Sequence, residues 1–136
     1  MSNRTYKFFF TSQTRYMNTA KAENSLATLL GKVVGHGCLS EYNVKLVNGV
    51  YGGHKEVSLC VETRNPRFWE QFVRDVCKEF KQESYLRVSP ACTALLLFVD
   101  GREDCAANLG KMVEVTKEEA SWTDHSEING QYFICR

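Results

Sequence analysis

The sequence of 136 residues lacks several features that mark large functional classes. Its 17 Lys and Arg residues nearly balance its 16 Asp and Glu residues, and the basic residues are scattered, so it offers no concentrated positive surface for nucleic acid. No segment approaches the roughly 20 apolar residues needed to cross a bilayer, and the apolar run near the start is too short for a signal peptide. We therefore expect one soluble, cytoplasmic domain spanning residues 1–136.

The chain also lacks the residue spacing of a metal site. Its six cysteines include no pair with the close spacing of zinc ligands, and its three histidines are dispersed. Cys60 falls in an apolar strand and Cys77 on the buried stripe of a helix, where a free thiol packs as a small apolar group. Nucleophile elbows and phosphate-binding loops are absent as well. We expect reduced thiols and no bound metal.

What is present is an alternation of short apolar strands with two amphipathic helices. Strands are expected at residues 6–11, 42–50 (broken by an Asn48-Gly49 turn), 57–61, 85–88, 94–99, 112–115 and 131–135. Helices are expected at residues 20–34, capped by Asn18 or Thr19 and stopped by Gly35 and Gly37, and at residues 65–82, with Asn65 as cap and Pro66 in the first turn.

This order of elements predicts an α+β fold. It is the order of a ferredoxin-like βαββαβ sandwich, an antiparallel sheet with two helices on one face, followed here by a C-terminal strand extension. The strand at residues 6–11 is expected to be central in the sheet. The C-terminal third is either an extension of the same domain or a surface that meets a neighbouring subunit.

The segment from Gly49 to Val88 carries most of the functional information. Glycines on both sides of Tyr51 let the backbone turn tightly around it, and Glu56 stands just before an apolar strand. A carboxylate beside an aromatic face, at a strand end next to a glycine-rich loop, favours a small cationic ligand. The plainer alternatives are that Glu56 is a surface carboxylate paired with Lys55 or Arg87, and that Tyr51 folds onto the core.

Four further side chains are candidates for substrate binding. Thr11 and Ser12, at the end of the first strand, have hydroxyl groups suited to a nucleoside or an amino acid, although capping of the loop is the simpler role. Gln82 and Glu83 follow the second helix and can serve merely as its solvated end. A carboxylate is electrostatically unfavourable at a helix C-terminus, however, so Glu83 is worth testing for a further role.

Residues 49–88 resemble the small S-adenosylmethionine lyases of bacteriophages, formerly called hydrolases. In that family, as here, a Gly-x-Tyr turn precedes a Glu at the mouth of a strand, and a helix ends in a Cys-x-Glu-aromatic-x-Gln pattern, which in this chain runs from Cys77 to Gln82. Residues 130–134 are similar to the closing strand of the family.

The resemblance implies an enzyme that needs no cofactor. It would cleave S-adenosylmethionine to 5′-methylthioadenosine and homoserine lactone by attack of the substrate's own carboxylate on its γ-carbon, and so deplete the methyl donor of a host and weaken restriction. Glu56 and Tyr51 would then be the catalytic residues, with Glu56 anchoring the cationic end of the substrate. The resemblance also implies a homotrimer with sites between subunits.

Two other classes of function remain open from the sequence. One is a non-catalytic phage protein that binds a host defence component or a nucleotide through its sheet. The other is a small adaptor without a ligand. Formation of methylthioadenosine from S-adenosylmethionine separates the enzyme from both.

Overall fold

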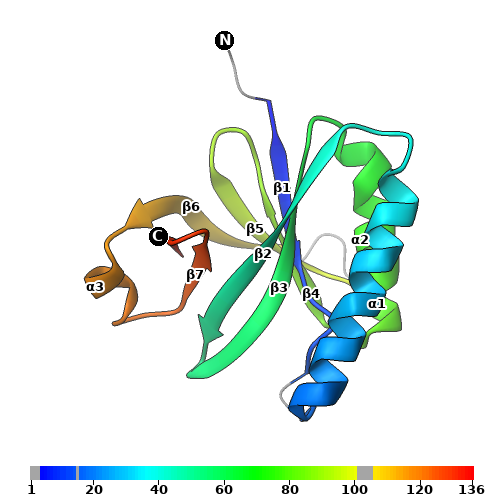
Figure 1. Cartoon of the computed structure of the whole chain (residues 1–136). Helices are drawn as coiled ribbons and strands as arrows, with labels where there is room; N and C mark the ends of the chain where they lie inside the picture. The colour runs from blue at the N-terminus through cyan, green and yellow to red at the C-terminus, as the bar shows by residue number, and fades with distance from the viewer. Residues whose placement is uncertain (1–3, 15, 101–105) are drawn as a thin grey trace.

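In the computed structural model, which describes residues 4–14, 16–100 and 106–136, antiparallel strands close into a barrel and two long helices lie side by side outside it (Figure 1). The strands are β1 (Tyr6–Phe10), β2 (Tyr42–Tyr51), β3 (His54–Thr63), β4 (Ser84–Val88), β5 (Thr93–Phe98), β6 (Ala107–Val115), β7 (His125–Ile128) and β8 (Gln131–Cys135). The helices are α1 (Thr19–Gly37), α2 (Pro66–Glu79) and the short α3 (Lys117–Ala120). None of the helices in the described ranges is long and apolar enough to cross a membrane.

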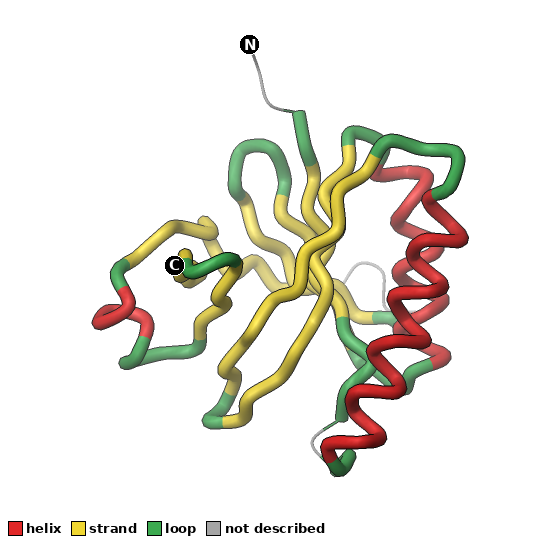
Figure 2. The backbone as a smooth tube through the Cα atoms, viewed as in Figure 1, coloured by secondary structure: helices red, strands yellow, loops and turns green. Residues whose placement is uncertain are grey.

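The expected ferredoxin-like sandwich is wrong, because the sheet closes on itself. Around the barrel the strands follow the order β1-β3-β2-β7-β8-β6-β5-β4, and β4 pairs again with β1. In an open sheet of four strands, β2 and β4 would be the edges. Here β7 pairs with β2, and β5 pairs with β4. Strands β8 and β6 connect β7 to β5, so the C-terminal strands leave neither edge unpaired. Figure 2 shows the strands surrounding an interior, with both long helices on one side.

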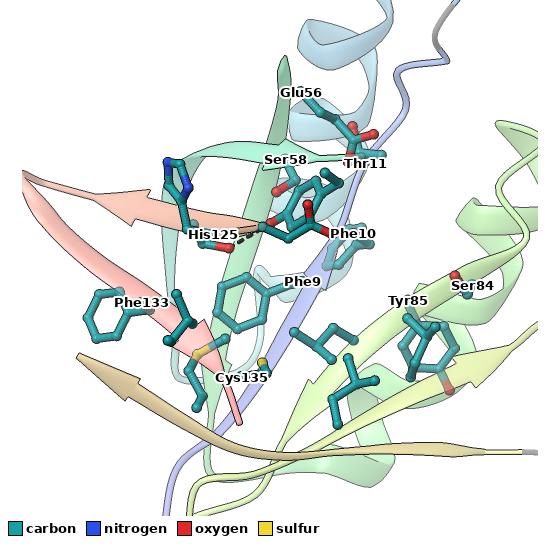
Figure 3. A pocket seen from close by; sticks show the side chains of 18 of the residues that line it. Phe9, Phe10, Thr11, Glu56, Ser58, Ser84, Tyr85, His125, Phe133 and Cys135 are labelled. Carbon is teal, nitrogen blue, oxygen red and sulfur yellow. Dashed lines mark hydrogen bonds between the residues drawn. The ribbon is translucent and has the colours of Figure 1, made fainter. Parts of the chain in front are cut away.

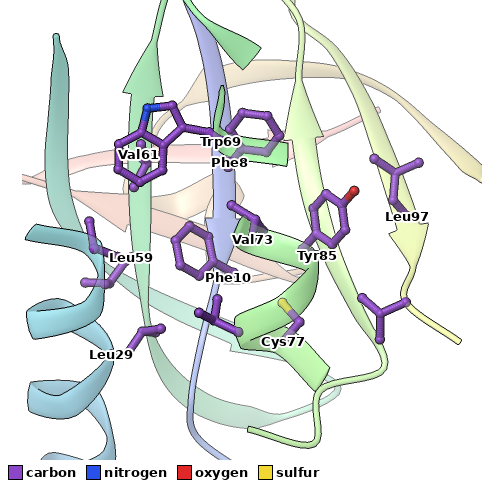
Figure 4. Packing of buried hydrophobic residues seen from close by; sticks show 13 residues of the cluster. Phe8, Phe10, Leu29, Leu59, Val61, Trp69, Val73, Cys77, Tyr85 and Leu97 are labelled. Carbon is purple, nitrogen blue, oxygen red and sulfur yellow. The ribbon is translucent and has the colours of Figure 1, made fainter. Parts of the chain in front are cut away.

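The larger hydrophobic core lies between the helices and the outer face of the barrel. The triple phenylalanine of β1 shows how it forms, because alternate strand residues point to opposite faces. Phe8 and Phe10 point toward the helices, and Phe9 points into the barrel. Trp69 of α2 is fully buried in the outer core. Figure 4 shows this packing, which includes Phe8, Phe10, Leu29, Leu59, Val61, Trp69, Val73, Cys77, Tyr85 and Leu97.

The barrel interior holds a second, smaller apolar cluster. Its buried members are Phe9, Val47, Cys60, Val88, Ala94, Met112 and Ile128. Toward the end where β2 begins and β3 ends, Lys45 and Glu62 form an ion pair of 3.1 Å. The opposite end is lined by polar side chains and opens into a cavity. The strands therefore supply both a core and a binding site from the same inner face.

The helix boundaries confirm one local prediction and correct another. Asn65 caps α2 as expected, accepting a hydrogen bond from the Phe68 N–H at 3.3 Å, and α2 begins at Pro66. Gly35 does not stop α1, which continues to Gly37. A Cβ at Gly37 would lie 2.4 Å from the Tyr42 ring, so this glycine is needed for packing.

The turn between β2 and β3 lies later than the sequence suggests. Strand β2 runs through the Asn48-Gly49 pair without a break and ends at Tyr51. The hairpin instead turns at Gly52 and Gly53, with φ angles of 57° and 81°. Two consecutive positive φ angles are what a tight hairpin turn needs, and glycine adopts them without strain. Strand β2 thereby gains the length that brings Tyr51 to the mouth of the barrel.

Candidate active site at the barrel mouth

A cavity of about 600 Å³ opens at the end of the barrel where β1 and β2 finish and β3 and β4 start (Figure 3). Four of the predicted site residues line it, namely Thr11, Tyr51, Glu56 and Gln82. Its polar side also includes Ser58, Ser84, Thr123, Asp124, His125 and Ser126. Its apolar side includes Phe9, Phe10, Leu86, Leu96, Leu109, Met112, Phe133 and Ile134.

Glu56 is the third residue of β3, close to the entrance of that strand. It pairs directly with Gly49, and alternation along β3 places its side chain on the same inner face as that of Cys60, a member of the interior cluster. Figure 3 shows it beside Thr11 at the cavity. Partial burial raises the pKa of the Glu56 carboxyl, because removal of water disfavours its charged form. The plainer alternative was pairing with Lys55 or Arg87, but Arg87 binds Glu70 at 2.6 Å, and the described residues show no ion pair between Glu56 and Lys55. The carboxylate is therefore available to a ligand with positive charge.

Tyr51 folds back over Gly49 instead of extending into solvent. A Cβ at Gly49 would lie 2.2 Å from Cε2 of the Tyr51 ring, so only glycine leaves room for this arrangement. The Tyr51 hydroxyl forms a 2.6 Å hydrogen bond with Oγ of Ser126. Burial raises the pKa of Tyr51, the bond to Ser126 opposes that rise, and the nearby carboxylate of Glu56 adds to it. The phenol therefore stays neutral beside Glu56.

Thr11 and Gln82 line the cavity and also hold its rim. Strand β1 ends at Phe10, and beyond it side chains take over the hydrogen bonds to the backbone of Val57. The Thr11 hydroxyl donates to the Val57 carbonyl at 2.7 Å, and Gln13 Oε1 accepts a hydrogen bond from the Val57 N–H at 2.9 Å. Gln82 Nε2 donates to the Gln13 carbonyl at 2.9 Å. This network fixes the residue that follows Glu56.

The structure does not bring Ser12 and Glu83 to the cavity wall. Ser12 is fully buried, and its hydroxyl is within hydrogen-bond distance, 3.1 Å, of the Ser25 hydroxyl on α1. Glu83 is exposed, and its carbonyl accepts a hydrogen bond from the Val99 N–H at 3.0 Å. His54 is exposed at the start of β3 and does not line the cavity.

Sequence reasoning missed the contribution of β7 and the loop before it. Asp124, His125 and Ser126 all line the cavity, yet no motif surrounds them. One signal was present: the Asn129-Gly130 turn and the strand after it imply a partner strand before the turn. Alternation then places Ser126 on the same face as the buried Ile128.

The charges of the cavity are one-sided. Within the described ranges, the lining includes the carboxylates of Glu56 and Asp124 but no Lys or Arg. The same ranges contain no group of three or more His, Cys, Asp or Glu side chains that could hold a metal ion. The site thus combines an acidic, hydrogen-bonding side with an apolar wall. Such a site suits a ligand that has positive charge at one end and a flat apolar group at the other.

A comparison with known protein families bears on this site. A model of the S-adenosylmethionine lyase family matches residues 7–136, which includes all the strands and helices described above except the first residue of β1. No curated protein matches the chain. The chain belongs to the S-adenosylmethionine lyase family, and it is a lyase whose substrate is S-adenosylmethionine.

Proposed function

We propose that the enzyme converts S-adenosylmethionine to 5′-methylthioadenosine and homoserine lactone in the barrel-mouth cavity. A carboxylate oxygen of the substrate forms a bond to the substrate's γ-carbon while the bond from that carbon to sulfur breaks. The electron pair moves to sulfur, which leaves as a neutral thioether, and no proton is transferred. The protein needs to supply neither a nucleophile nor a cofactor, only the folded conformer of the substrate. Intramolecular positioning of this kind contributes roughly 7–11 kcal/mol in favourable cases.

The observation that carries this proposal is the one-sided charge of the cavity. Glu56 and Asp124 attract the ammonium and sulfonium groups of the substrate, and partial burial strengthens this attraction. Among the described lining residues there is no Lys or Arg to pair with the substrate carboxylate. An unpaired carboxylate is a better nucleophile than one held in an ion pair. The same charges thus bind the substrate and leave its reacting group free.

The apolar side of the cavity accounts for the other half of the substrate. Side chains including Leu86, Leu96, Met112 and Phe133 offer an apolar wall for the methylthioadenosine group. A cavity of about 600 Å³ is within the range of roughly 300–1,000 Å³ that small-ligand sites occupy. In this assignment Glu56 and Tyr51 hold the cationic end, and Thr11 and Gln82 contact the substrate from the rim. Ser12 and Glu83 are left without a direct role.

The biological role and assembly follow from the family resemblance. Removal of the methyl donor inside an infected cell would weaken restriction, as expected of a phage enzyme acting in the host cytoplasm. A homotrimer is part of the same proposal. What supports self-association is the exposure of apolar side chains on α1 and β2, namely Leu30, Val34 and Leu46.

The origin of the γ-oxygen in the product tests the mechanism. In water enriched in ¹⁸O, attack by the substrate carboxylate leaves the γ-oxygen of homoserine unlabelled, even after the lactone opens at its carbonyl. Mass spectrometry of the homoserine fragments measures this directly. Label on the γ-hydroxyl would overturn the lactone mechanism and require a group that activates water. Formation of methylthioadenosine in the same reaction serves as the control for turnover.

A further inference from the structure

Ser126 occupies a special place in the ladder that forms the cavity. Gly49 of β2 is paired with Glu56 of β3 on one side and with Ser126 of β7 on the other. Directly paired residues point to the same face of a sheet, so these three form one row across the inner wall. Because Gly49 has no side chain, the middle of the row is open. The Tyr51 ring fills it, with its hydroxyl 2.7 Å from the place of a Gly49 Cβ.

The segment around β7 holds the hairpin of Tyr51 through further contacts. Asp124 Oδ1 accepts a hydrogen bond of 2.9 Å from the N–H of Gly52, the residue after Tyr51. Asn48 Nδ2 donates to Glu127 Oε1 at 3.3 Å. Tyr51 is therefore flanked by Glu56 from β3 and by β7, which lies on the other side of β2.

We propose that Ser126 is a positioning residue for the lyase reaction, holding the Tyr51 ring in the cavity beside Glu56 before the substrate arrives. This inference rests on the proposed function, which assigns Tyr51 and Glu56 to the substrate. Tyr51 is 38% exposed, so part of its side chain is in contact with water. Ser126 is only 5% exposed, so the hydrogen bond between its hydroxyl and the Tyr51 hydroxyl is shielded from water. A ring fixed in advance avoids the cost of ordering it during binding.

A double-mutant cycle tests whether Ser126 acts through the Tyr51 hydroxyl. Ser126→Ala and Tyr51→Phe each remove the same hydrogen bond, and each is expected to lower kcat/KM by about 5- to 10-fold. The double variant is expected to match Tyr51→Phe alone, because the bond can be lost only once. Ser126→Thr keeps the hydroxyl and is expected to recover most of the activity. Circular dichroism and thermal melting establish that each variant is folded.

The outcomes separate this inference from the proposed function. A double variant that is again 5- to 10-fold below Tyr51→Phe would overturn the inference, since Ser126 would then act independently of the phenol. Wild-type activity in Ser126→Ala, together with large losses in Glu56→Gln and Tyr51→Ala, would overturn it while leaving the proposed function standing. Wild-type activity in both Glu56→Gln and Tyr51→Ala would overturn the proposed site and this inference with it.

Discussion

Glu56 is the residue whose protonation state matters most to the proposed site. Burial raises its pKa, so in the free enzyme the carboxyl loses its charge at a higher pH than an exposed glutamate does. The neutral form no longer attracts the cationic substrate. We therefore predict that kcat/KM falls as the pH drops through this raised pKa, which kcat/KM reports for the free enzyme.

Glu56→Gln is the matched control for this pH profile. It keeps the shape of the side chain, removes its charge, and is expected to lower kcat/KM by about 100-fold while removing the acidic limb of the profile. If Glu56→Gln keeps the acidic limb of the kcat/KM profile, a group other than Glu56 is responsible for that limb.

The raised pKa of Glu56 also links folding stability to pH, because burial of the charged carboxylate destabilises the folded state. The neutral carboxyl contributes stability that is fully present below the pKa of the unfolded chain and is lost as the pH rises through the raised pKa of the folded protein. Glu56→Gln cannot become charged, so its urea midpoint at neutral pH should equal or exceed that of the wild type.

Strand β2 has a glycine, Gly49, at the position over which the Tyr51 ring packs. Gly49→Ala places a methyl group where the Tyr51 ring lies, and the ring must leave the cavity. We predict that this variant loses activity to about the extent of Tyr51→Ala. Methylthioadenosine formation measures the effect.

Gly35 in α1 offers the matched glycine control. It has nothing within 4 Å of an added Cβ and lies away from the cavity. Gly35→Ala should raise the free energy of unfolding by about 0.5–1 kcal/mol, because alanine favours the helix, and should leave activity unchanged. Full activity in Gly49→Ala would show that the position of the Tyr51 ring is unimportant to the reaction.

The whole molecule is expected to self-associate. Light scattering should give a mass near three times the 15.5 kDa of one chain, with apolar side chains of α1 and β2 covered in the assembly. Val34→Glu and Leu46→Lys place charges at two of these exposed positions and should lower the mass. If they yield a monomer with wild-type kcat, the sites are not shared between subunits, and the cavity within one barrel is the complete active site.

Much of the fold could be predicted because its signals are local. The Asn65-Pro66 cap, the apolar stripe of α2 and the period-two pattern of the strands depend on residues a few positions apart. The sequence likewise placed four site residues at the ends of strands or helices, namely Thr11, Tyr51, Glu56 and Gln82. These ends meet at the barrel mouth, so the four side chains line one cavity. Ser12 and Glu83 sit next to such positions but lie in bends outside the strands, where Ser12 meets Ser25 of α1 and Glu83 is exposed to solvent.

The sequence by itself determined the order of strands and helices from β1 to β5, the closing strand β8 and the family. Only the tertiary structure decided that the sheet closes and that Ser126 meets Tyr51. These depend on pairings such as β2 with β7, between residues more than 70 positions apart. Backbone hydrogen bonds of this kind form between strands of almost any sequence. Which edges meet is therefore set by the packing of the whole chain, not by any segment of it.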